Sequence, residues 1–90
     1  MTICEILAIN LKYYRKVFNL SQEKFAVILG TSLSYLNQIE NNKVDVKSST
    51  IDKFAHNLSI YNKEMGITSE DLVTYDENRL TNYSRIDEKK

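Results

Sequence analysis

The sequence contains no proline and only two glycines, Gly30 and Gly66, among its 90 residues. Proline and glycine are the residues that most often interrupt regular structure, so long stretches of this chain contain nothing that would break a helix. Its apolar residues recur at intervals of three and four, which is the spacing of one face of an α-helix. We therefore expect an all-α fold, a compact bundle of about five helices.

The first predicted helix is marked at both ends. Thr2 and Glu5 have the spacing of a capping box, in which each side chain satisfies a backbone amide that the helix leaves unpaired. Asn19 can adopt the left-handed conformation that ends a helix. Between these ends, an apolar stripe recurs at steps of four, three and four: Leu7, Leu11, Tyr14 and Phe18.

Two short helices follow across a tight turn. The first begins at Ser21 and stops at Gly30, and the second begins at Ser32 and ends at Asn42. Their inner residues are predicted to be Phe25, Ala26, Leu29, Leu36 and Ile39. This is helix-turn-helix spacing, in which one helix holds a second across DNA, with a core at residues 21–42. A helical hairpin in any all-α protein could share it.

The second half of the chain is less sharply marked. A fourth helix begins near Ser48 or Ser49 and either continues to Gly66 or breaks at residues 59–60, a choice that the sequence does not decide. A fifth begins at Thr68, with Leu80 as a possible late apolar position. We assign residues 1–75 to one domain and residues 76–90 to a charged tail, whose end we expect to be frayed or disordered.

Composition excludes several classes of protein. Twelve basic residues balance twelve acidic ones, which argues against a strongly basic nucleic-acid coat and against an acidic tail protein. Cys4 is the only cysteine, so no internal disulfide forms, and this suits a reducing cytoplasm. No apolar run approaches the ~20 residues of a membrane span, and the N-terminal residues do not resemble a signal peptide. We expect a cytoplasmic protein with no membrane contact.

Catalytic chemistry is not indicated either. His56 is the only histidine and is expected at a helix edge facing water. A metal site needs several ligands at fixed spacing, and none is recognisable. Cys4 has no histidine nearby in the sequence, and no glycine-rich phosphate loop exists. We expect no enzyme activity, no cofactor and no metal.

Three short motifs follow one another closely along the chain. Residues 20–26 read L-S-Q-E-K-F-A, residues 29–32 read L-G-T-S, and residues 35–40 read Y-L-N-Q-I-E. Over residues 11–58 the chain resembles the Cro and lambda-repressor-like (XRE-type) helix-turn-helix family, whose pattern reads L-S-Q-x-x-L-A, L-G-x-S and Y-I-x-x-I-E at the same offsets. The departures are asparagine for glycine at 19 and 42, valine for proline at 46, and phenylalanine for leucine at 25.

The resemblance implies a lambda-repressor-like domain that binds double-stranded DNA with its third helix in the major groove. The expected base-reading residues are Leu33, Ser34, Tyr35, Asn37 and Gln38. Gln38 could pair with adenine and Leu33 could contact a thymine methyl group, and the set contains no arginine, so an A·T-containing half-site is favoured. These residues could instead form a solvated face, and for Asn37 the two readings weigh equally.

Other residues are expected to grip the DNA backbone or to hold the fold. The expected phosphate contacts are Ser21, Gln22, Asn41, Lys43 and Lys47. Residues 1–47 hold six basic against four acidic side chains, and residues 48–90 hold six against eight, which gives mild support. The resemblance also suggests that Arg15 and Glu40 form a structural ion pair between the first and third helices.

A single helix reads only a few base pairs, so we expect a homodimer on a near-palindromic operator, with half-sites about one DNA turn, ~34 Å, apart. Ile60, Leu72 and Val73 are candidates for the dimer interface, unless they close the core of the monomer. The favoured function is a sequence-specific transcription regulator, most simply a repressor. The alternative is a protein-interaction module on the same scaffold, such as an antitoxin or adaptor, that binds a protein partner through residues 61–90.

Overall fold

A computed structural model describes residues 1–79, and within them the chain is all-helical, as expected. Its five α-helices are α1 (Ile3–Val17), α2 (Gln22–Leu29), α3 (Leu33–Glu40), α4 (Ser48–Tyr61) and α5 (Ser69–Val73). Residues 77–79 are helical again. The expectations of a frayed end and of an apolar Leu80 fall on residues 80–90 and lie outside the described part.

The first three helices begin where their cap residues predict. Thr2 and Glu5 form both hydrogen bonds of a capping box at the start of α1. The hydroxyls of Ser21 and Ser32 each accept a hydrogen bond from the backbone amide three residues later, at the starts of α2 and α3. Local side-chain chemistry therefore fixes these three starts.

The first three helices also end as predicted, on residues in the left-handed conformation. Asn19 has a φ of 56°, Asn42 of 55° and Gly30 of 78°. Asparagine tolerates this region better than most residues, because its short polar side chain can bond to the local backbone. The two asparagines therefore adopt the left-handed conformation at positions where the family pattern has glycine.

Helix α4 ends at neither of the two positions that the sequence suggested. It stops at Tyr61, between the break at residues 59–60 and the run to Gly66. The physical reason is Asn62, whose backbone leaves the helical conformation (φ −136°, ψ 89°) and whose side-chain oxygen accepts from the Met65 amide at 3.2 Å. Such a local side-chain bond competes with continuation of the helix. At its start, α4 is capped by Lys47 without a side-chain hydrogen bond.

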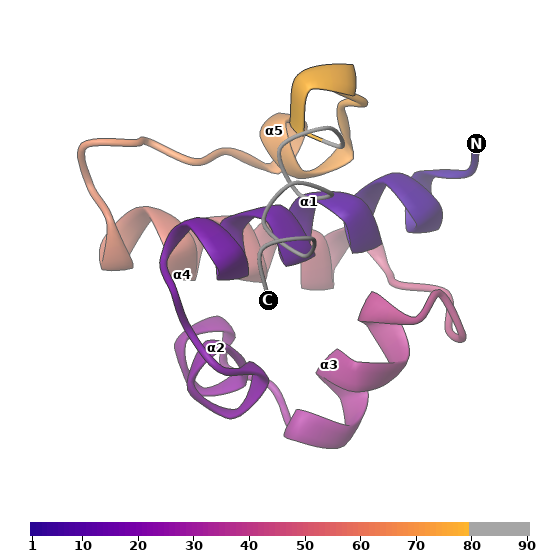
Figure 1. Ribbon diagram of the computed structural model, residues 1–90, viewed down its shortest axis with the longest axis horizontal. Coiled ribbons are helices and arrows are strands. Elements are labelled where there is room, and N and C mark those ends of the chain that lie inside the picture. Colours follow the sequence, from indigo (N-terminus) through magenta and orange to yellow (C-terminus); the bar gives the residue numbers. More distant parts are fainter. Residues whose placement is uncertain (80–90) are drawn as a thin grey trace.

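The helices enclose one apolar core. Helix α1 contacts α3 and α5, while α4 contacts α2 and α5. Figure 1 shows α2 and α3 together on one side of the molecule and α5 on the opposite side. Fully enclosed side chains come from every helix: Leu7, Leu11, Phe25, Leu29, Leu36, Phe54, Leu58 and Leu72. The pair α2–α3 is therefore held on a base formed by the other three helices.

Helix α5 is fastened to α1 by a buried amide. Asn10 is 1% exposed, and its Nδ2 donates to the carbonyls of Asp71, Leu72 and Thr74 at 3.2, 2.8 and 3.1 Å. Its oxygen accepts from Arg79 Nη1 at 3.3 Å. Since α5 has only five residues, these bonds satisfy carbonyls that the helix cannot pair internally. The packed structure extends at least as far as Arg79.

One dimer-interface candidate is wrong. Leu72 has no exposed surface, because it points into the core of the monomer that α5 closes, so it cannot form an intermolecular contact in this fold. Val73 is half-buried against the same core, and Ile60 is 57% exposed. Of the three candidates, Ile60 alone presents most of its side chain at the surface.

Helix α4 also holds the turn between α2 and α3. Asn57 Nδ2 donates to the carbonyl of Leu29 at 2.8 Å, and Lys53 Nζ donates to that of Gly30 at 3.0 Å. The last carbonyls of a helix have no partner within it, so side chains from a neighbouring helix can satisfy them. These two bonds anchor the end of α2 and the turn that leads into α3.

Candidate nucleic-acid interface

Helix α3 has an apolar inner side and a polar outer side. Leu36 and Ile39 are buried in the core, whereas Ser34 and Gln38 are exposed. Leu33, in the first turn, is 46% exposed. Of the other expected reading residues, Asn37 is exposed and Tyr35 is half-buried against the core. The structure thus brings four of the five to the surface and leaves Tyr35 mostly as a packing residue.

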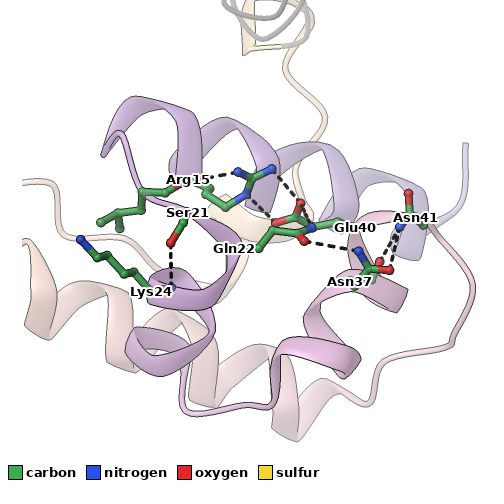
Figure 2. A network of polar contacts seen from close by, with 8 residues as sticks. Arg15, Ser21, Gln22, Lys24, Asn37, Glu40 and Asn41 are labelled. Carbon is green, nitrogen blue, oxygen red and sulfur yellow. Dashed lines mark hydrogen bonds and ion pairs between the residues drawn. The ribbon is translucent and has the colours of Figure 1, made fainter.

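The N-terminus of α2 lies beside this helix. Ser21 and Lys24 are exposed there, and Ser21 Oγ accepts from the Lys24 amide at 3.1 Å (Figure 2). The first amides of a helix point outward with a partial positive charge, so they can donate to an anion such as a phosphate. Lys43 and Lys47 are exposed on the loop that follows α3. Backbone and side-chain donors therefore lie on α2 and on the following loop, both beside the C-terminal half of α3.

An ion pair joins α1 to α3 behind the outer surface. Arg15 Nε and Nη2 each donate to one oxygen of Glu40, both at 3.0 Å, in a two-pronged arrangement. The side chain of Glu40 is 2% exposed and that of Arg15 is 14% exposed. Arg15 Nη1 also donates to the carbonyl of Leu20 at 3.4 Å. A paired guanidinium and carboxylate of this geometry hold two helices in a fixed orientation.

Gln22 adds a third donor to the Glu40 carboxylate. Its Nε2 donates to Glu40 Oε1 at 3.0 Å, and its Oε1 accepts from Asn37 Nδ2 at 3.3 Å. The amide of Asn41 in turn donates to the carbonyl and side-chain oxygens of Asn37, at 2.8 and 3.2 Å. Figure 2 shows these side chains converging from α1, α2 and α3. Sequence reasoning assigned Gln22, Asn37 and Asn41 to DNA separately and missed that they bind one another.

The remaining features of the described residues concern metal ligands, membrane-spanning helices and reactive side chains. No cluster of three or more histidine, cysteine, aspartate or glutamate side chains there could hold a metal ion. No helix among those residues is long and apolar enough to cross a bilayer. Cys4 is half-buried, and its thiol faces Asp45 Oδ1 at 3.8 Å. His56 is exposed on α4.

Two titratable groups with altered pKa values lie on α1, away from this surface. The backbone amide of Thr2 donates to the Glu5 carboxylate and lowers the pKa of that group below its ordinary value. Burial raises the pKa of the Tyr14 phenol, and the nearby positive charge of Arg79 opposes part of that rise. Both shifts belong to the packing of α1 and not to the surface formed by α2 and α3.

Comparisons with known proteins found a family and a relative that are similar to this chain. A family described as a helix-turn-helix domain matches residues 8–86. The control protein C.SmaI of Serratia marcescens is 43% identical over 51 residues, an alignment that covers 57% of this chain. The chain spans 61% of the length of that relative. No solved structure matches the chain.

Proposed function

The chain belongs to the XRE-like family of helix-turn-helix domains, and we propose on that basis that it is a transcription regulator that binds double-stranded DNA. One observation carries the proposal: Leu33, Ser34 and Gln38 are exposed on one helix whose opposite side is buried and whose end is fixed by an ion pair. A helix presented in this way fits the major groove of B-DNA. A relative named as a control protein accords with a regulatory role.

Sequence discrimination is proposed for the outer side of α3. The Gln38 amide can pair with both polar groups on the edge of an adenine, and the Leu33 side chain can contact a thymine methyl group. The hydroxyl of Ser34 can donate or accept, so it suits either type of base pair. Tyr35 is half-buried, and any contact with DNA would use the part of its side chain that remains exposed. We expect operators with A·T pairs in each half-site.

Register on the DNA is proposed to come from phosphate contacts. The amides at the N-terminus of α2, with Ser21, would contact one strand, and Lys43 and Lys47 lie beyond the end of α3. Asn41 ends α3, but Asn37 accepts both hydrogens of its side-chain amide, so Asn41 would have to release one of them to contact a phosphate. Contacts of this kind carry no sequence information but fix the position of the reading helix. They should also make binding fall as the salt concentration rises, because each neutralised phosphate releases counterions.

The proposed assembly is a homodimer on a near-palindromic operator in the cytoplasm, acting as a repressor by covering a promoter. One recognition helix contacts few base pairs, so two copies about one DNA turn, ~34 Å, apart are needed for useful specificity. The exposed side chain of Ile60 and the half-buried Val73 are available to such an interface.

A selection of bound fragments from a random DNA pool, followed by titration of the selected duplex, tests the proposal. Gln38→Ala should relax preference at one base pair by ~1–3 kcal/mol, whereas Lys43→Ala should weaken selected and scrambled duplexes alike and reduce the salt slope by about 1. Lys63→Ala removes the same charge from the loop between α4 and α5 and is the matched control, with no expected effect. Failure to bind any duplex, together with co-purification of a second protein, would favour an antitoxin or adaptor instead.

A further inference from the structure

The amides beside the ion pair are aligned in one direction. An ionised carboxylate only accepts hydrogen bonds, so Gln22 must turn its nitrogen toward Glu40. The oxygen of that amide then faces Asn37, which must present its own nitrogen. The remaining oxygen of Asn37 accepts from Asn41. One buried charge thus sets the orientation of three successive amides (Figure 2).

This chain of bonds crosses the space between two helices. Gln22 is the first residue of α2, and Asn37 lies in α3, one residue before Gln38. The bonds begin at Glu40, which is almost fully enclosed, and end at Asn37 and Asn41, which are exposed. The Gln22 side chain on α2 is therefore oriented by two residues of α3.

We infer that Asn37 is a positioning residue, which orients the Gln22 amide toward a DNA phosphate and does not itself read a base. A carboxamide nitrogen carries two hydrogens, and Gln22 uses one of them on Glu40, which leaves the second for a phosphate oxygen. The bonds to Gln22 and Asn41 hold the Asn37 amide in one orientation, and turning it to meet both polar groups of an adenine edge would break them. The inference rests on the proposed function, since it assumes that this surface binds DNA.

Affinities of single and double variants test the inference on the selected duplex and on a scrambled one. Asn37→Ala and Gln22→Ala should each reduce affinity about threefold to tenfold on both duplexes, the value of one lost hydrogen bond. The double variant should bind no more weakly than the weaker single variant, because both changes remove the same contact. Gln38→Ala is the matched control on the same helix, and its effect should multiply with that of Gln22→Ala.

A measurement without DNA checks that the change is local. In the amide spectrum of the isotopically labelled protein, Asn37→Ala should shift the side-chain signals of Gln22 and leave those of Asn57 unchanged. The midpoint of urea unfolding should stay at the wild-type value, since Asn37 is exposed and alanine favours helices.

Three outcomes would overturn the inference while leaving the proposed function intact. These are a change of preference at a single base pair in Asn37→Ala, multiplying effects of Asn37→Ala and Gln22→Ala, and unchanged Gln22 signals in Asn37→Ala. Failure of the wild-type protein itself to bind duplex DNA would overturn the proposed function first, and the inference with it.

Discussion

Removal of the Arg15 guanidinium is the sharpest test of how α3 is held. In Arg15→Met the Glu40 carboxylate keeps its place, 2% exposed, and loses both donors of the two-pronged pair. The Gln22 amide remains as its one side-chain donor. An enclosed charge that loses its partner destabilises a fold by about 3–5 kcal/mol. A folded chain of this length has about 5–13 kcal/mol in total, so the variant should be marginally stable.

Urea unfolding followed by far-ultraviolet circular dichroism measures the change in the free energy of unfolding. The matched control is Arg15→Met combined with Glu40→Leu, which removes both charges and fills similar space. Because replacing both partners of an enclosed pair is often neutral, the double variant should regain most of the loss. A loss below about 1 kcal/mol in Arg15→Met, as for a surface pair, would refute the reasoning, as would a double variant as unstable as the sum of the single ones.

Three further outcomes concern other parts of the fold. Asn10→Ala removes the side-chain donor of the Leu72 and Thr74 carbonyls, while the Asp71 carbonyl keeps Arg79 Nη1, and should cost about 1–3 kcal/mol in urea unfolding. The raised pKa of Tyr14 means that the neutral phenol is favoured in the fold. Its contribution to the free energy of unfolding is complete below the pKa of an unfolded tyrosine and is lost as pH rises through the higher pKa of the folded state. Gly30→Ala should destabilise more than Gly66→Ala, because both positions have a positive φ but only at Gly30 would the new Cβ lie 3.1 Å from Asn57 Nδ2.

Each of these outcomes has its own check. The loss in a double variant of Asn10→Ala with Arg79→Ala should differ from the sum of the two single losses, since both residues act on one group of bonds. Ultraviolet absorbance during alkaline titration, compared between wild type and Tyr14→Phe, isolates the Tyr14 phenol, and a difference signal that titrates with exposed tyrosines would contradict the assignment. Equal losses in the two glycine variants would show that the contact with Asn57 carries no cost.

The features that the sequence predicts well are those encoded within a few residues. The starts of α1, α2 and α3 follow from hydroxyl side chains that bond an amide three residues later, and their ends follow from Asn19, Gly30 and Asn42. Alternation of apolar and polar residues along α3 also predicts which side faces the core. These signals lie within a few residues of one another along the chain, so no knowledge of the tertiary arrangement is needed to use them.

Features that depend on how distant helices meet could not be derived in the same way. Nothing near Leu72 in the sequence shows that this residue packs into the core of the monomer and does not form part of a dimer interface. Arg79 packs against the rings of Tyr13 and Tyr14, a contact across more than sixty residues. The bond between Gln22 and Asn37 likewise exists only once α2 and α3 are placed side by side. A reading of the sequence therefore assigns Gln22 and Asn37 to DNA contacts one at a time and does not detect the bond between them.

The grip of Asn57 and Lys53 on the turn has a consequence for genetics. Both residues belong to α4, yet they fix the backbone at which α2 gives way to α3. A random screen for loss of DNA binding should therefore recover uncharged substitutions at Asn57, although this residue does not lie on the outer side of α3. Such mutants would change the orientation of α3 by removing a hydrogen bond that holds the turn before it. From phenotype alone they would be mistaken for mutants of DNA-contacting residues.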